Sequence, residues 1–150
     1  MNELPPASSR PSRLSLAAHI VVVGSLALSF FSGVALWYGQ SASAETFSPP
    51  SWLHGTRVLH GVLNPILCAV FGFLVCQHIR YGWALRANWI TGLLMEGAFA
   101  ALIVSALAIY YADEGAFRGL LASLHRFLGA ALPAILAIHW VAARQWVKKI

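Results

Sequence analysis

Two histidines in the apolar C-terminal run, His125 and His139, lie fourteen residues apart. On an α-helix this spacing turns through about 1400°, about 40° short of four full turns, so both side chains leave the same face. They would lie about 21 Å apart along the helix axis. Neutral imidazole is a common metal ligand and an axial ligand of haem iron. The spacing therefore predicts two ligand positions on one helix face at two depths.

Composition indicates that these positions lie in a membrane. The chain has 150 residues, of which 59% are hydrophobic and 10% are charged, whereas soluble domains are about 25% charged. About 20 apolar residues cross the hydrocarbon of a bilayer, and four runs are long enough: 14–38, 53–79, 88–112 and 119–147. Short connections make sequential helices antiparallel neighbours. We expect an all-α membrane protein, an up-down bundle of four transmembrane helices.

The basic residues flank the apolar runs and do not form a patch, which argues against a nucleic-acid partner and predicts an orientation. With four crossings one side carries most of them: Arg10, Arg13, Arg80, Arg86, Arg144, Lys148 and Lys149. The positive-inside rule then places both termini in the cytoplasm. We expect a disordered cytoplasmic tail at 1–13, the membrane bundle at 14–147, and a cytoplasmic C-terminal end at 148–150.

The first apolar run has an alternative interpretation as a cleaved secretory signal. In "SASAET", Ala42 and Ala44 are the small residues that precede a signal-peptidase site. The apolar stretch before them is about 25 residues, longer than the 7–15 of a signal sequence. A retained membrane helix is the favoured interpretation.

Four histidines pair by depth when the runs alternate in direction. His60 and His125 fall near the outer surface, and His19 and His139 fall near the cytoplasmic surface. Each pair joins two helices across the bundle interior, as the axial ligation of a b-type haem requires. A flat apolar haem also suits a bundle core. The pattern predicts two haem b groups, the outer iron bound by His60 and His125 and the inner iron by His19 and His139.

Other histidines offer alternatives to this assignment. His78 could replace His19 at the inner iron, and His54 competes with His60 at the outer one. His54 is expected at the level of the headgroups, so His60 is favoured. Each histidine could also simply donate a hydrogen bond between helices.

Several neighbours of the predicted ligands bear on haem binding. Arg57, one turn before His60, could pair with a haem propionate or extend to the membrane surface. Pro133 should bend the last helix between its two histidines. Arg126, beside His125, has no partner that the sequence identifies. Small residues near the ligands would let a porphyrin approach the backbone or would serve helix packing: Gly33, Gly61 and Gly129.

The motifs "RVLHG" at 57–61 and "FFSGVAL" at 30–36, with the four histidines, resemble a known family. It is the bacterial dihaem cytochrome b family of the b561 type. This family includes the gamma subunit of formate dehydrogenase and the cytochrome b subunit of NiFe-hydrogenases. The resemblance covers essentially all of the spanning part. In the family, a first-helix histidine pairs with the second histidine of the fourth helix, and a second-helix histidine pairs with the first. Here these roles fall on His19 with His139 and on His60 with His125.

The resemblance implies electron transfer across a bacterial inner membrane, between the quinone pool and a periplasmic redox subunit such as an iron–sulfur or multihaem protein. The chain would then be the quinone-linked subunit of a membrane oxidoreductase complex, surrounded by lipid. Quinone chemistry needs proton donors or acceptors near the inner haem. The candidates at the cytoplasmic end are His78, Arg86, Asn88 and Glu96. Glu96, an acid inside an apolar run, could relay protons or serve an interhelical hydrogen bond.

Two other functions compete with this one. A stand-alone cytochrome b could react with a small diffusible species such as superoxide. A haem-free membrane anchor or assembly subunit would use its histidines only to link helices. The pairing by depth argues against the haem-free interpretation.

Overall fold

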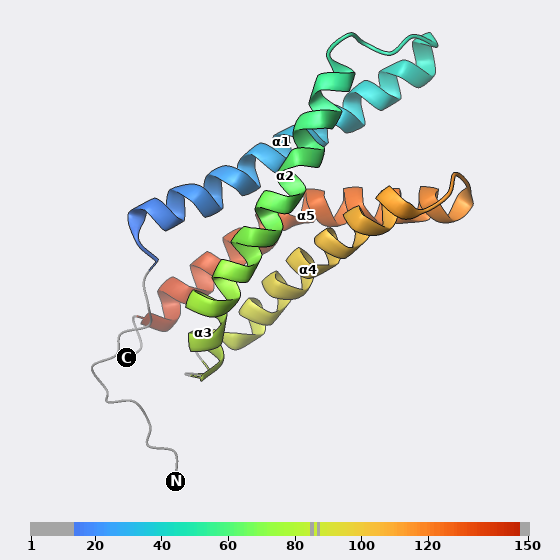
Figure 1. The fold of residues 1–150 in the computed structure, drawn as a ribbon. Helices are drawn as coiled ribbons and strands as arrows, with labels where there is room; N and C mark the ends of the chain where they lie inside the picture. Colours follow the sequence, from blue (N-terminus) through green and yellow to red (C-terminus); the bar gives the residue numbers. More distant parts are fainter. Residues whose placement is uncertain (1–13, 85, 87, 148–150) are drawn as a thin grey trace.

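The computed structural model describes residues 14–84, 86 and 88–147 of the chain. The predicted tail at 1–13 and the predicted end at 148–150 lie outside these residues. The described residues form α1 (Leu16–Thr46), α2 (Leu53–Leu74), a π-helix η1 (Val75–Ile79), α3 (Arg80–Ala84), α4 (Trp89–Tyr111) and α5 (Ala116–Val147). Because α2, η1 and α3 are continuous, four helical segments are long and apolar enough to cross a membrane. The predicted all-α fold with four membrane helices is confirmed (Figure 1).

The first helix is longer than the predicted run, which ended at residue 38. It begins after Ser15, whose hydroxyl accepts a hydrogen bond from the Ala18 amide at 3.2 Å, as helix N-caps do. It ends at Phe47, which adopts a left-handed conformation with φ 54°. The prolines that follow cannot continue a helix. The "SASAET" stretch is therefore the last part of a continuous helix.

The second membrane segment also extends beyond the predicted end at residue 79. The π-helix at Val75–Ile79 does not end the segment, because α3 continues it to Ala84. Single π-turns occur frequently at functional sites, and this one contains His78. The connection to α4 then turns through Arg86 and Asn88, which have φ of 48° and 51°.

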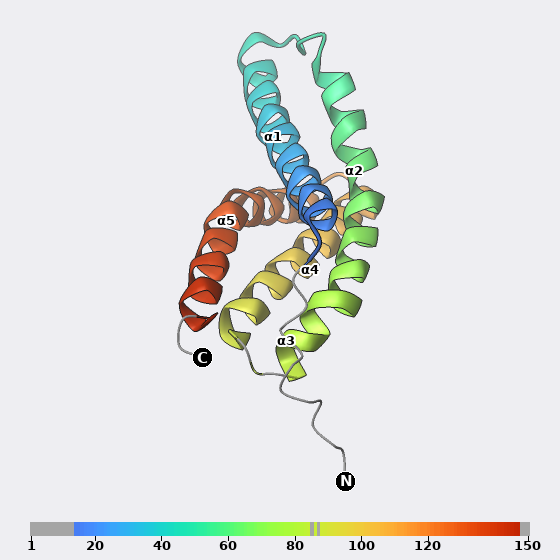
Figure 2. The same cartoon turned by 90° about the vertical axis from the view of Figure 1, so that its left-hand side faces the viewer.

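The helices are arranged as two antiparallel hairpins that cross (Figures 1 and 2). The most extensive contacts are those of α1 with α2 and of α4 with α5, and α1–α5 and α2–α4 contacts join the hairpins. Figure 2 shows that α5 changes direction in its middle part, and Pro133 lies inside this helix. A proline inside a helix removes one backbone hydrogen bond and permits such a bend.

A small apolar core lies where the two hairpins meet. Leu26 of α1, Phe99 of α4 and Leu132 of α5 are buried in it. Phe71 of α2 stacks on Phe99 with 5.1 Å between ring centroids and 21° between planes. All four membrane segments therefore contribute to one apolar layer, referred to below as the central layer.

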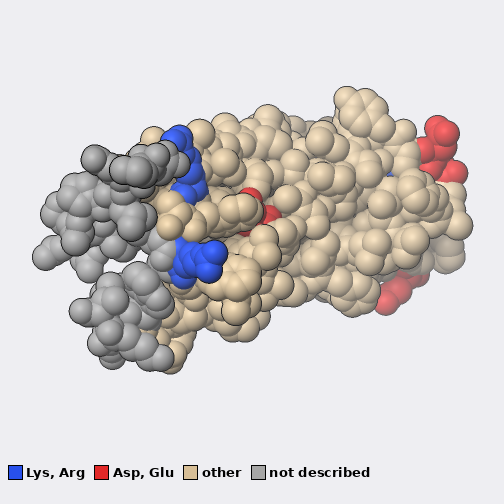
Figure 3. Space-filling view, turned by 90° about the horizontal axis from the view of Figure 1, so that it is seen from below, with Lys and Arg blue, Asp and Glu red and all other residues tan. Residues whose placement is uncertain are grey.

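The surface outside the core is apolar along most of its length. Figure 3 shows Lys and Arg gathered toward one end, and acidic side chains at the other end and at one place between. The basic end holds Arg80, Arg86 and Arg144, and the acidic end holds Glu45, Asp113 and Glu114. Many large apolar side chains are exposed between the ends, as a lipid-facing surface requires.

Candidate functional site: two histidine pairs

The outer histidine pair consists of His60 from α2 and His125 from α5. Their ring centroids lie 6.3 Å apart and the ring planes are inclined by 88°. Both side chains are half-buried. The structure thus brings together the two histidines that the depth argument paired, while their binding of iron stays a prediction.

A buried serine hydroxyl contacts each ring of the outer pair. Ser32 Oγ lies 2.9 Å from His60 Nδ1, and Ser105 Oγ lies 2.8 Å from His125 Nδ1. Each hydroxyl also donates to the backbone carbonyl three residues earlier, at 3.0 Å and 3.1 Å. With the hydroxyl hydrogen placed on that carbonyl, the serine oxygen would accept from an Nδ1–H group of the ring. This tautomer leaves the lone pair of each ring on Nε2, where a metal can bind.

The outer pair lines a cavity of about 730 Å³, within the range of about 300–1,000 Å³ typical of small-molecule sites. The central layer contributes to its walls through Leu26, Phe99 and Leu132. The three glycines noted in the sequence, Gly33, Gly61 and Gly129, all line it. A Cβ atom at Gly33 would lie 3.2 Å from His60 Cε1, so this glycine gives the imidazole its room.

At the inner position the structure brings together His139 and the alternative ligand His78, while the ligation of an inner iron by His19 and His139 stays a prediction. His139 of α5 lies beside His78, with ring centroids 6.4 Å apart and planes inclined by 87°. His19 is exposed, and its Nδ1 lies 3.1 Å from the Ser15 carbonyl. It is still close enough to His78 to interact electrostatically. His78, the alternative inner ligand named from the sequence, lies in the π-helix of a segment that continues to Ala84, and its side chain is exposed.

His139 is held by polar residues at the start of α4. Thr91 Oγ1 lies 3.1 Å from His139 Nδ1 and donates to Asn88 Oδ1 at 2.7 Å. Asn88 Nδ2 in turn donates to the His139 carbonyl at 3.1 Å. A hydroxyl thus lies at Nδ1 of His139 as it does at the outer rings, but here the Asn88 amide nitrogen also lies 3.4 Å from the same Nδ1. Sequence reasoning missed all three hydroxyls, although Ser32 and Ser105 stand out as polar residues in apolar runs.

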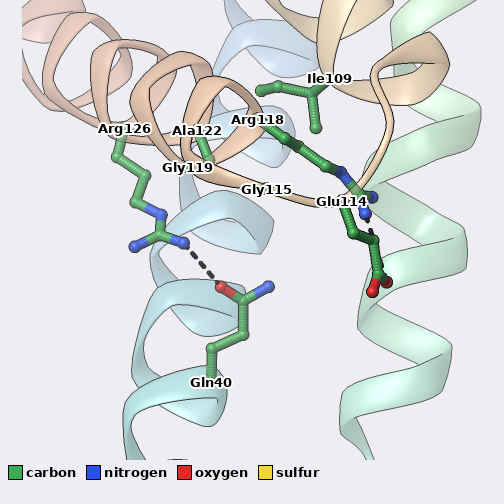
Figure 4. A pocket seen from close by; sticks show the side chains of 8 residues that line it. All are labelled: Gln40, Ile109, Glu114, Gly115, Arg118, Gly119, Ala122 and Arg126. Carbon is green, nitrogen blue, oxygen red and sulfur yellow. Dashed lines mark hydrogen bonds and ion pairs between the residues drawn. The ribbon is translucent and has the colours of Figure 1, made fainter.

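The predicted cationic partner of the outer site is not at the cavity. Arg57 and His54 are exposed on the first turns of α2 and do not line the cavity. Arg126 does line it, and its Nη2 donates to Gln40 Oε1 at 3.1 Å (Figure 4). The cavity is thus lined by Arg126, the arginine for which the sequence identified no partner, and the exposed Arg57 agrees with the alternative that it extends to the membrane surface.

The four quinone candidates separate into two groups. His78 and Asn88 belong to the inner pair and its hydrogen bonds. Arg86 is exposed in the turn between α3 and α4. Glu96 has a buried Oε2 atom with no hydrogen-bond partner among the described residues. Of the four, Glu96 and Arg86 are therefore the candidates that the histidine network does not already use.

The described part of the chain contains no group of three or more His, Cys, Asp or Glu side chains that could hold a metal ion. A bare structural metal such as zinc requires four ligands.

Comparisons of the chain with protein-family models, curated proteins and solved structures give no match. The resemblance to dihaem cytochromes b rests on the histidines and motifs alone, and it stays a prediction.

Proposed function

We propose that the chain is a membrane-embedded dihaem cytochrome b subunit that transfers electrons between the quinone pool and a periplasmic redox partner. The observation that carries this proposal is the separation of the two imidazole pairs, 6.3 Å and 6.4 Å between centroids. Each pair joins two helices of the bundle, so each can hold a ligand between them.

The separation suits axial ligation. With metal–imidazole bonds of about 2.0–2.1 Å and about 1.1 Å from nitrogen to ring centre, two imidazoles on opposite sides of one metal have centroids about 6.2–6.4 Å apart. Two imidazoles hydrogen-bonded to each other, at about 2.9 Å between nitrogens, would have centroids about 5.1 Å apart. Both observed separations match the first arrangement and exceed the second. This supports ligation over a direct hydrogen bond between the paired rings.

The hydrogen bonds of the rings also support ligation. Metal-binding histidines usually donate their second N–H to a protein acceptor, which fixes the tautomer and raises the basicity of the ligand. Ser32, Ser105 and Thr91 supply such acceptors for His60, His125 and His139, respectively. A haem-free anchor has no need of this arrangement repeated three times.

Haem iron bound at each pair would supply one-electron transfer between the ferrous and ferric states. The chain's own histidines would hold the iron through Nε2 atoms at two depths, and the apolar walls of the outer cavity would exclude water there. By helix geometry His125 and His139 are about 21 Å apart along the helix. The cofactors expected are two haem b groups, with a quinone as substrate.

The distribution of charge supports the expected orientation. The end that carries Arg80, Arg86 and Arg144 would face the cytoplasm of a bacterial inner membrane, and both termini would lie there. The inner pair would then be the one near the quinone, with Glu96 as its nearby acid. The redox partner would approach the acidic end beside the outer pair.

The decisive experiment is a haem count and a reduced-minus-oxidised spectrum of the purified chain. We expect a b-type α-band and two haems per chain, and absence of the band would refute the proposal. His60→Ala or His125→Ala should leave one haem. His54→Ala, which changes an exposed histidine outside the cavity, should leave two and serves as the matched control.

The same count identifies the fourth ligand. His78→Ala should lose the inner haem and His19→Ala should keep it, because His78 lies beside His139. The opposite result would restore the pairing of His19 with His139 predicted from the sequence.

A further inference from the structure

Arg126 lines two neighbouring cavities in the outer half of the molecule. One is the cavity of the outer histidine pair, and the other is a smaller pocket of about 330 Å³ beside the α4–α5 turn. Arg126 and Gln40 line both of them. Figure 4 shows the guanidinium of Arg126 reaching from α5 toward the Gln40 amide on α1.

The charge of Arg126 has no counter-ion among the described residues. The ion pair that they contain joins Arg118 to Glu114 at 3.8 Å, and Figure 4 shows Arg118 pointing away from Arg126 toward that acid. Arg126 is about 15 Å along α5 from its first residue. An arginine within a membrane helix is costly unless it meets a partner or water.

The geometry of Arg126 defines which partner would suit it. A guanidinium carries five N–H donors in a planar fork that matches the two oxygens of a carboxylate. The bond to Gln40 Oε1 uses one donor. The Gln40 amide nitrogen, at the same wall, offers a neutral donor to a second oxygen.

We propose that Arg126 and Gln40 form a carboxylate-binding site at the outer mouth of the cavity. The inference rests on the proposed function where the carboxylate is a propionate of the outer haem. Arg126 follows His125 directly, and both residues line the same cavity, so a group bound at His125 has its edge within reach of Arg126. A small free carboxylate entering the pocket is the other source of the same chemistry.

The test uses the full-length purified chain, haem b and its dimethyl ester, in which both propionates are uncharged. Wild type should bind the ester roughly tenfold to a hundredfold more weakly than haem, the usual range for a charged hydrogen bond. Arg126→Gln should weaken haem binding by a similar factor and leave ester binding unchanged. Arg57→Gln, the same charge change outside the cavity, should alter neither.

Further variants and a probe separate the remaining outcomes. Arg126→Lys keeps the charge without the fork and should bind haem with intermediate affinity, while circular dichroism reports whether each variant folds. Equal weakening of haem and ester by Arg126→Gln would overturn the inference, and so would no weakening of either together with no succinate binding that depends on Arg126. Succinate is titrated against the same proteins. Binding of succinate that Arg126→Gln abolishes, with haem and ester equivalent in wild type, would assign the site to a free carboxylate. Failure of wild type to bind any haem would refute the proposed function, and the succinate titration would still decide the site.

Discussion

Ser105→Ala should raise the midpoint potential of the outer haem. The substitution removes the hydroxyl that lies 2.8 Å from His125 Nδ1. Ser105 is only 8% exposed, so water does not readily replace it. The ring then loses its hydroxyl partner and keeps only the Leu102 backbone carbonyl, and the loss of a buried hydrogen bond costs at most about 1–3 kcal/mol. Lower basicity of the imidazole weakens its bond to ferric iron more than its bond to ferrous iron. The ferric state is therefore destabilised relative to the ferrous state, and the midpoint potential rises.

The size of the shift follows from the affinity change. Loss of such a supporting hydrogen bond typically weakens metal binding about tenfold to a hundredfold. If the affinity of the site for ferric haem falls tenfold more than its affinity for ferrous haem, the midpoint potential rises by about 59 mV for a one-electron couple. The assay is a potentiometric titration followed at the α-band, in which the two haems give two waves. The outer wave should move upward and the inner wave should stay.

Ser25→Ala is the control for this measurement. Ser25 is partly buried on α1 and bonds to the Val22 carbonyl at 3.0 Å, so the change deletes a hydroxyl that donates only to its own helix. The reasoning is refuted if Ser105→Ala leaves the outer wave in place, or if both waves move together. An equal shift in the Ser25 variant would also refute it.

Three further substitutions test other parts of the structure. Thr91→Val removes the hydroxyl beside the inner pair without changing volume, and the inner wave alone should rise in the same titration. Gly33→Ala places a methyl group 3.2 Å from His60 Cε1 and should lower the occupancy of the outer haem, measured as haem per chain; unchanged occupancy would contradict the close approach. Gly39→Ala places a Cβ atom 2.6 Å from the Trp52 ring and should destabilise the α1–α2 contact by about 1–3 kcal/mol. Thermal unfolding followed by circular dichroism should show this as a lower midpoint temperature.

The sequence predicts the four membrane helices well because each is a long apolar run with few charges. It predicts their ends less well. Residues 39–46 lack strong apolar character, yet they continue α1 because no proline interrupts them before Pro49. The π-turn at Val75–Ile79 is likewise invisible to a periodicity of 3.6 residues, since it depends on how the backbone accommodates its neighbours.

The site residues near well-predicted helix starts could be placed from the sequence, whereas those near helix ends or at helix contacts could not. His60 and His125 lie near the starts of their helices, so counting from the ends gives their depths correctly. His78 lies at the far end of its segment inside the π-turn, where a periodicity of 3.6 residues does not give the direction of its side chain. The contacts of Ser32, Ser105 and Arg126 require the rotation of one helix against another. A single sequence does not contain that information.

The stacked rings of Phe71 and Phe99 have a consequence for energy conservation. They belong to an apolar layer that lies between the outer and the inner histidine pair and whose buried members, Leu26, Ala98, Phe99 and Leu132, carry no polar side chain. Under the proposed function, an electron crossing this layer moves one charge through the membrane potential, worth about 2.3 kcal/mol per 100 mV. An apolar layer would also hinder the return of protons, because an ion in hydrocarbon is costly. The layer would then act as an ionic insulator, and the charge separated by each electron would remain available to the cell.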